Sequence, residues 1–312
     1  MDRILPTESA TAAAAADADT PSVLPRTHEE KLLLLNGRYE LTGSLLGEGG
    51  YGKVFLAIDH GNHQQKVAIK ICDMSSRYSS VYLAQRRREA DIGIQIPAHP
   101  NVCKTLDSFV IGHIFYIVME LFEGKSLDVY MCENKWNPKN PSNYLAILYQ
   151  MALAIKHLHA NGFIHRDIKP ANFIVLQKPD GTILVILNDF GLSNQSDIVE
   201  QETVGTPFFM SPQVARWKEI SEKCDIWAFG VLVLLILTRK NVPLYLEGIK
   251  NSERAISEIC NLTVNPFPVN LTENKNPMVR LIANIAKRCL EIKPSMRPSA
   301  AEIAERLSAF KA

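Results

Sequence analysis

The chain has 312 residues, of which 46% are hydrophobic, and this is enough to bury one large core or two smaller ones. Its 34 basic and 33 acidic residues leave a formal charge of +1, so neither a nucleic-acid partner nor a membrane partner is expected. The six cysteines are widely spaced and lack a Cys-x-x-Cys pair. This pattern indicates buried thiols in a reducing compartment, not disulfides or a zinc site.

No targeting or membrane-spanning segment is expected. The chain does not open with a cationic stretch followed by an apolar run, and Asp2 excludes N-myristoylation. The longest apolar run, Ile226 to Leu237, is too short for a bilayer that needs about 20 residues, and it predicts a buried core helix. We expect a cytoplasmic protein, with a nuclear location left open.

Two regions of different composition follow one another. Residues 1–36 combine an alanine run with aspartates and prolines and contain no aromatic residue. This composition predicts a disordered tail, which is either plain solvated chain or a docking or regulatory segment. Residues 37–312 are predicted to form one domain with a small lobe at 37–121, a hinge at 121–124 and a larger lobe at 125–312.

A glycine-rich turn is the first candidate for ligand binding. It contains Gly47, Gly49 and Gly52 between two predicted strands, and glycines let backbone amides approach phosphate oxygens. A Rossmann loop would open a helix, and a Walker loop would need Ser or Thr at Val54. A hairpin that folds over a nucleotide remains, with an ordinary glycine-rich turn as its alternative.

The first lobe is predicted to be a five-stranded sheet with one helix. The strands are expected at 39–47, 53–59, 67–70, 102–110 and 114–120, and the helix at 79–95. Lys70 ends a β-branched strand, and Glu89 on the helix is its candidate partner. The same helix carries three arginines at 86–88, which we expect to form a solvated face.

Beyond the hinge the chain becomes mostly helical. Apolar residues at helical spacing predict helices at 127–132 and 142–160, and β-prone runs predict a hairpin at 173–177 and 183–187.

The loop from His165 to Asn172 carries the strongest chemical signal. It places a possible base, Asp167, beside the cation Lys169 and the carboxamide Asn172, three groups that phosphoryl transfer needs close together. Asp189 opens an Asp-Phe-Gly sequence directly after the hairpin, so its carboxylate can return to the same cleft.

Together and in this order, these motifs resemble the signature set of eukaryotic-type protein kinases over about residues 39–310. The resemblance implies an α+β, bilobal protein kinase fold, with a small lobe built on a five-stranded antiparallel sheet and one main helix, and a larger, mostly helical lobe. Lys169 and the Gly205-Thr206 pair resemble serine/threonine kinases more than tyrosine kinases. Residues 204–213 resemble the end of a kinase activation segment and are similar to Nek or Ste20-type kinases, whereas residues 297–303 look like tyrosine kinases, so no subfamily is assigned.

The resemblance implies ATP as the phosphoryl donor and proteins as acceptors. Lys70, paired with Glu89, would hold the α- and β-phosphates. The expected ATP-contacting residues are Gly47, Gly49, Gly52, Val54, Ala68, Lys70, Glu89, Glu120, Phe122 and Ile174.

Catalytic and metal roles are also implied by the resemblance. Asp167 would accept or orient the substrate hydroxyl, and Lys169 would balance charge on the γ-phosphoryl group. Asp189 and Asn172 would bind Mg²⁺, with Mn²⁺ as a possible substitute.

Two departures from the family pattern concern packing. Gln213 stands where the family has a Glu that pairs with the arginine corresponding to Arg297, so we expect a hydrogen bond in place of an ion pair and weaker anchoring of the activation segment. Gly93 stands where a larger apolar residue usually packs on Phe190, and compensation by Ile94 is left open. Asp225 is expected to bind the backbone amides at residues 165–166.

Regulation is expected to centre on Arg166, which kinases of this type neutralise with an anion in the activation segment. The usual phosphoacceptor position holds Glu202, so one hypothesis is that this carboxylate partly replaces phosphate. The alternative is a solvated Glu202 beside a phosphorylatable Thr203. Thr206 is expected to hydrogen-bond Asp167 and Lys169, not to be phosphorylated.

Three other functions are alternatives to a serine/threonine kinase. A scaffold without activity would normally lack Lys70, Asp167 or Asp189, yet all three are present, which leaves a catalytically weak scaffold as one alternative. A dual-specificity kinase is another. A small-molecule kinase would lack the 205–213 segment and the helix that begins near Asp225. The oligomeric state is not indicated.

Overall fold

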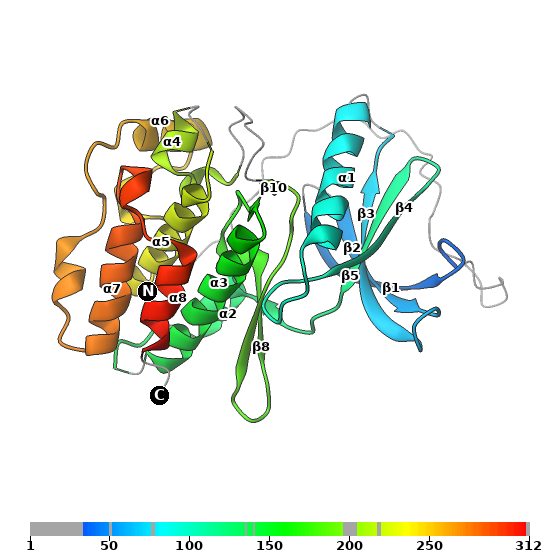
Figure 1. The fold of residues 1–312 in the computed structure, drawn as a ribbon, viewed down its shortest axis with the longest axis horizontal. Helices are drawn as coiled ribbons and strands as arrows, with labels where there is room; N and C mark the ends of the chain where they lie inside the picture. Colours follow the sequence, from blue (N-terminus) through cyan, green and yellow to red (C-terminus); the bar gives the residue numbers. More distant parts are fainter. Residues whose placement is uncertain are drawn as a thin grey trace, which may run out of the picture.

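An antiparallel sheet and a larger helical lobe lie next to each other in the computed structural model (Figure 1). The structure describes residues 34–49, 52–75, 79–134, 136–139, 141–195, 205–216 and 220–309. The predicted tail therefore falls almost wholly outside the described residues. Within them, no helix has both the length and the apolar character needed to cross a membrane.

The small lobe is a five-stranded sheet with the order β1-β2-β3-β5-β4 and antiparallel pairing throughout. The strands are β1 (Tyr39–Gly49), β2 (Gly52–Asp59), β3 (Gln65–Asp73), β4 (Thr105–Ile111) and β5 (Ile114–Glu120). The middle of β3 is buried on both faces, because Val67 and Ile69 contribute to one apolar cluster and Ala68 and Cys72 to another. The predicted sheet is confirmed.

The strand β4 is shorter than predicted, because the residues before it pair with the large lobe. The amide of Cys103 donates to the carbonyl of Leu187 at 2.8 Å, and the amide of Leu187 donates to the carbonyl of Asn101 at 2.8 Å. Residues 101–103 are thus tied to β9 (Ile183–Leu187), and regular pairing with β5 begins only at Thr105.

The helix α1 (Ser79–Gln95) has the predicted bounds and lies beside the sheet (Figure 1). The remaining helices are α2 (Leu127–Glu133), α3 (Ser142–Ala160), α4 (Pro212–Ala215), α5 (Lys223–Thr238), α6 (Ser252–Cys260), α7 (Pro277–Cys289) and α8 (Ala300–Ser308). Short strands complete the large lobe: β6 (Lys125–Ser126), β7 (Phe163–Ile164), β8 (Phe173–Gln177) and β10 (Asn194–Gln195).

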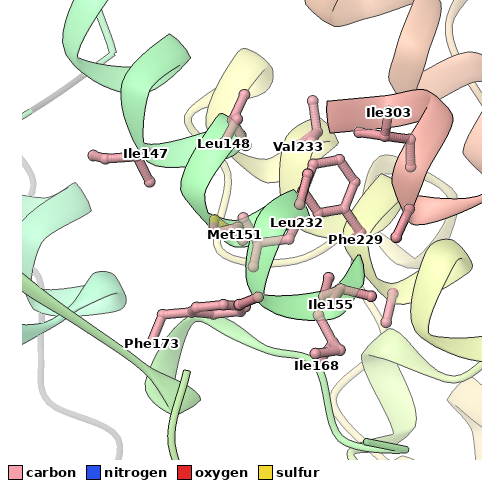
Figure 2. Close-up of a cluster of buried hydrophobic side chains, with 14 of the residues drawn as sticks. Ile147, Leu148, Met151, Ile155, Ile168, Phe173, Phe229, Leu232, Val233 and Ile303 are labelled. Atoms are coloured by element: carbon pink, nitrogen blue, oxygen red, sulfur yellow. The ribbon is translucent and has the colours of Figure 1, made fainter. Parts of the chain in front are cut away.

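The core of the large lobe lies where α3, α5 and α8 meet (Figure 2). Every residue of α5 from Cys224 to Ile236 is buried, which confirms the predicted core helix. Figure 2 shows Met151 and Ile155 of α3 close to Phe229 and Leu232 of α5. This all-round burial gives a rigid support for the loops that α5 contacts.

All six cysteines are free. Four are buried, Cys260 is half-buried and Cys132 is exposed, so the expected burial holds for most of them.

Candidate functional site

A cleft of about 270 Å³ lies between the sheet and the large lobe. Its walls combine backbone of the glycine-rich turn, apolar side chains and a group of charged and amide side chains. The residues that line it include Gly47, Gly52, Val54, Lys70, Glu89, Met119, Asn172 and Asp189.

The glycine-rich turn connects β1 to β2 over the cleft. A Cβ atom on Gly52 would lie 2.3 Å from the carbonyl oxygen of Ile71, and its φ of +131° is one that residues with side chains rarely adopt. A Cβ on Gly47 would meet nothing within 4 Å. The protein itself therefore requires the glycine at 52, whereas the space beside Gly47 is open. Gly49 pairs with Gly52 at the end of the hairpin.

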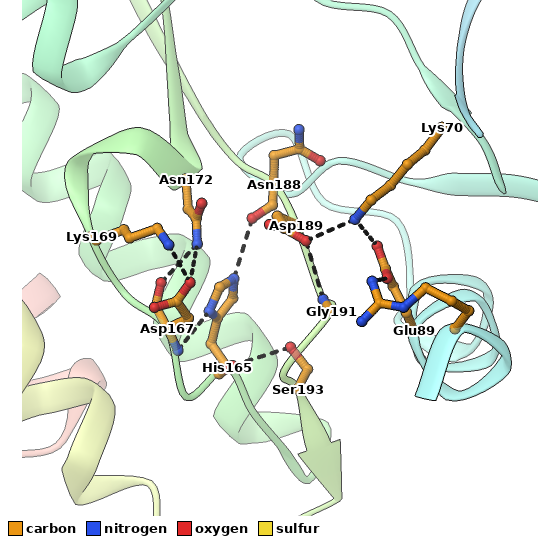
Figure 3. Close-up of polar contacts among 11 residues, drawn as sticks. Lys70, Glu89, His165, Asp167, Lys169, Asn172, Asn188, Asp189, Gly191 and Ser193 are labelled. Atoms are coloured by element: carbon orange, nitrogen blue, oxygen red, sulfur yellow. Dashed lines mark hydrogen bonds and ion pairs between the residues drawn. The ribbon is translucent and has the colours of Figure 1, made fainter. Parts of the chain in front are cut away.

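Three charged side chains meet on the sheet side of the cleft (Figure 3). The ammonium of Lys70 on β3 donates to Oε1 of Glu89 on α1 at 2.6 Å and to Oδ1 of Asp189 at 3.3 Å. Burial lowers the pKa of Lys70, but the two carboxylates outweigh this effect and the net pKa is raised. Lys70 is therefore a permanent cation, held between the helix and the Asp-Phe-Gly segment.

Asp189 is half-buried and adopts a φ of +64°, which is unusual for a residue with a side chain. Burial raises the pKa of its carboxyl group, but Lys70 and other partners outweigh burial and the pKa is lowered overall. Asp189 is thus an anion facing the cleft, and the neighbouring Phe190 is buried.

Asp167 is held by four donors from three residues. Its Oδ1 accepts from the amide of Thr206 at 3.0 Å and from the hydroxyl of Thr206 at 2.8 Å. Its Oδ2 accepts from Lys169 at 2.6 Å and from the amide nitrogen of Asn172 at 3.2 Å (Figure 3). Lys169 also donates to the Thr206 hydroxyl at 3.0 Å, so the predicted contacts of Thr206 are present.

The loop that carries Asp167 is supported from α5. The carboxylate of Asp225 accepts from the amides of His165 and Arg166 at 2.9 and 2.8 Å, as predicted, and from His159 on α3 at 2.9 Å. Arg166 has a φ of +67°, a conformation of a non-glycine residue that the surrounding structure must stabilise.

Four of the predicted ATP-contacting residues gather in one apolar cluster. Ala68 is buried in it, and Val54, Phe122 and Ile174 pack against it partly buried. The carboxylate of Glu120 accepts from the amide of Lys104 at 3.1 Å. The structure thus brings these four predicted residues together.

The regulatory residues are only partly described. The Nε of Arg166 donates to the carbonyl of Leu192. Glu202 and Thr203 lie outside the described residues, so the hypothesis that Glu202 replaces a phosphate stays a prediction.

Gln213 and Arg297 form the expected hydrogen bond in place of an ion pair. The Nη2 of Arg297 donates to Oε1 of Gln213 at 3.0 Å, and both side chains are buried. The side-chain nitrogen of Gln213 has no hydrogen-bond partner among the described residues. Burial lowers the pKa of Arg297 to about 10.

The space beside Gly93 is filled from β4. A Cβ at residue 93 would lie 2.0 Å from Oγ1 of Thr105, while Phe190 would be 3.7 Å away. Ile94 is 43% exposed, so its side chain does not take the place of the one that is missing at Gly93.

Sequence reasoning missed Arg86. The predicted solvated face is wrong at this position, because Arg86 is fully buried and pairs with Glu89, whereas Arg87 and Arg88 are exposed. The three-residue spacing between Arg86 and Glu89 places both on one helix face, and this signal could have indicated the pair.

Comparison with protein families matches residues 41–307 to the protein kinase domain. The chain therefore belongs to this family, and the expected bilobal protein kinase fold is confirmed. Members of the family generally use ATP and a divalent metal ion.

Three similar proteins support the same assignment. The chain is 31% identical over 266 residues to the hormonally up-regulated neu tumor-associated kinase homolog of Xenopus tropicalis, covering 83% of this chain and 36% of the relative. It is 33% identical over 208 residues to the serine/threonine-protein kinase PrkC of Bacillus subtilis, covering 65% and 31%. It is 30% identical over 272 residues to calcium-dependent protein kinase 7 of Arabidopsis thaliana, covering 86% and 48%. The chain thus spans about a third to a half of these relatives.

Proposed function

We propose that this chain is an ATP-dependent protein serine/threonine kinase that transfers the γ-phosphoryl group of Mg-ATP to hydroxyl groups of proteins. The observation that carries this proposal is the meeting of two groups at one cleft: Lys70, Glu89 and Asp189 on the sheet side, and on the other side Asn172, whose amide nitrogen contacts Asp167. Phosphoryl transfer depends mainly on positioning and electrostatic stabilisation, which such fixed charges supply.

The donor set of the cleft fits a nucleotide with a divalent cation. The carboxylate of Asp189 and the side-chain oxygen of Asn172 are ligands that Mg²⁺ and Mn²⁺ prefer, and the amide nitrogen of Asn172 is already bound to the carbonyl of Asp167 at 2.8 Å. A bound metal ion neutralises charge that develops on the phosphates. Lys70 would pair with the α- and β-phosphates, beneath the glycine-rich turn.

The apolar cluster around Ala68 would enclose the adenine ring of ATP. Val54 and Ala68 line it on the sheet side and Ile174 on the β8 side. Backbone groups of Glu120 and Phe122 in the hinge are proposed to hydrogen-bond the adenine.

The contacts of Asp167 suggest how it receives a substrate hydroxyl. A carboxylate offers about four lone-pair sites, and four donors occupy them here. When a γ-phosphoryl group is in place, Lys169 can turn from Oδ2 toward it. Because Asn172 stays bound to Oδ2, this frees one lone-pair position of that oxygen, which can then orient the hydroxyl and accept its proton.

An assay of phosphate incorporation from Mg-ATP into generic protein substrates tests the proposal. The wild type should modify serine and threonine, and Asp167→Asn should lower kcat by about 10²-fold or more, because proton acceptance typically contributes that much. Lys70→Met should weaken nucleotide binding as well. The absence of incorporation by the wild type would favour the scaffold, and phosphotyrosine would indicate dual specificity.

A further inference from the structure

Arg86 is a buried charge behind Glu89, next to the cleft, and the proposed function leaves it without a role. It lies on α1 three residues before Glu89, its side chain is 0% exposed, and its Nη1 donates to Oε2 of Glu89. Lys70 donates to the other oxygen, Oε1. Each oxygen of Glu89 therefore has a cation of its own.

Among the described residues, the two carboxylates of this cluster are balanced only when Arg86 is counted together with Lys70. Lys70 and Arg86 face Glu89 and Asp189. Phosphates bound beside Lys70 would add negative charge there. The ammonium would then have to share its hydrogen bonds among the phosphates, Glu89 and Asp189. A guanidinium is planar, remains charged and binds carboxylates in a fixed orientation, so Arg86 can hold Glu89 while Lys70 turns toward the phosphates.

The same pair also contacts the Asp-Phe-Gly segment. A Cβ at Gly191 would lie 3.3 Å from Nη1 of Arg86 and 3.3 Å from Oε2 of Glu89. The backbone at Gly191 thus packs directly over the Arg86–Glu89 contact. A shift of this contact would move the loop that carries Asp189.

We propose that Arg86 is a positioning residue for nucleotide phosphates: it fixes Glu89, and through Glu89 it sets the place of Lys70 and of the Asp189 loop. This inference rests on the proposed function, since it assigns Arg86 a role in the same cleft. Misplacement of a phosphate-binding group by about 1 Å can cost about 10²-fold in rate.

The test compares Arg86→Met, which keeps an apolar stem in the buried site, with Arg87→Ala, an exposed arginine of the same helix. In full-length protein, Arg86→Met should raise KM for ATP and lower kcat/KM for ATP by about 10- to 100-fold, while KM for the protein substrate stays unchanged. Arg87→Ala should match the wild type. Arg86→Lys, which restores a cation without the planar fork, should recover part of the loss.

A double-mutant cycle separates positioning from folding. In a Glu89→Gln background, Arg86→Met should add little further loss, because the residue acts through Glu89. An equal factor in both backgrounds, an unchanged KM for ATP, or the same loss with Arg86→Lys as with Arg86→Met would overturn the inference.

Binding of Mg-ATP, followed as a rise in Tm, distinguishes failure of this inference from failure of the proposed function. If the wild type transfers no phosphate, the proposed function fails. The inference then stands if Mg-ATP stabilises the wild type and Arg87→Ala but not Arg86→Met, and it falls if Arg86→Met is stabilised as much as the wild type or if Mg-ATP stabilises none of the three.

Discussion

Arg297 is a buried cation whose hydrogen bonds all go to neutral oxygens. It donates to the carbonyls of Glu291, Lys223 and Ile292 and to the side chain of Gln213, and it lies 4.8 Å from the ring centre of Trp227. Within the described part of the chain, no carboxylate lies at ion-pair distance from it. A buried charge without an opposite charge is a costly arrangement.

The substitution Gln213→Glu should therefore stabilise the protein. It replaces the unpaired side-chain nitrogen of Gln213 with a second oxygen and gives Arg297 an anion at a contact that now measures 3.0 Å. A gain of about 1 kcal/mol would raise Tm by about 2–4 °C. Thermal unfolding measures this, with Gln213→Leu as a control that should lower Tm. An unchanged or lower Tm for Gln213→Glu would contradict the prediction.

The contact between α1 and β4 depends on the absence of a side chain at residue 93. The Oγ1 and Cβ of Thr105 occupy the place where a larger residue would project, at 2.0 and 2.8 Å from the Cβ position. The helix and the strand therefore approach through Gly93, and Phe190 packs below them.

The substitution Gly93→Ala should destabilise the small lobe. Overpacking costs about 1–3 kcal/mol, which exceeds the gain of about 1 kcal/mol from replacing glycine in a helix. Urea unfolding should show a lower midpoint for Gly93→Ala. Combination with Thr105→Ala should recover part of the loss because it removes the closest atom, and purely additive effects of the two substitutions would show that they do not clash.

Most elements could be predicted from the sequence, but the first residue of β4 could not. The bounds of α1, α3, β5, β8 and β9 follow from local periodicity and match the structure. The residues before Thr105 have the same β-prone character as the strand itself. Asn101 and Cys103 instead form hydrogen bonds with Leu187, which is distant in the sequence, and no local pattern indicates such a partner.

Asp225 connects the core helix α5 to α3 and to the loop that carries Asp167. It is 1% exposed and accepts hydrogen bonds from His159, His165 and Arg166. Burial raises the pKa of its carboxyl group, but the hydrogen bond and charge of His159 and the backbone donors outweigh burial, and the pKa is lowered.

This lowered pKa predicts a pH-dependent contribution to stability. A carboxylate with a depressed folded pKa stabilises the protein above its unfolded pKa of about 3.9, and the contribution is lost as the pH falls through the folded value. Asp225→Asn should therefore be less stable than the wild type at pH 7, by about 3 kcal/mol or more, and the gap should narrow below about pH 4. Urea midpoints from pH 7 to pH 3 measure the gap, and a constant gap would rule out this linkage.

The candidate site was predictable as far as its motifs are local. The residues of the 165–172 loop, the Asp-Phe-Gly segment and the glycine-rich turn are set by short sequences whose chemistry and order indicate their meeting in one cleft. Only the tertiary structure shows that Arg86 is buried while its neighbours Arg87 and Arg88 are exposed, and that Thr105 fills the space beside Gly93. The physical reason is that burial, close contact and charge pairing depend on atoms from distant segments, whereas periodicity and motif spacing depend only on neighbours along the chain.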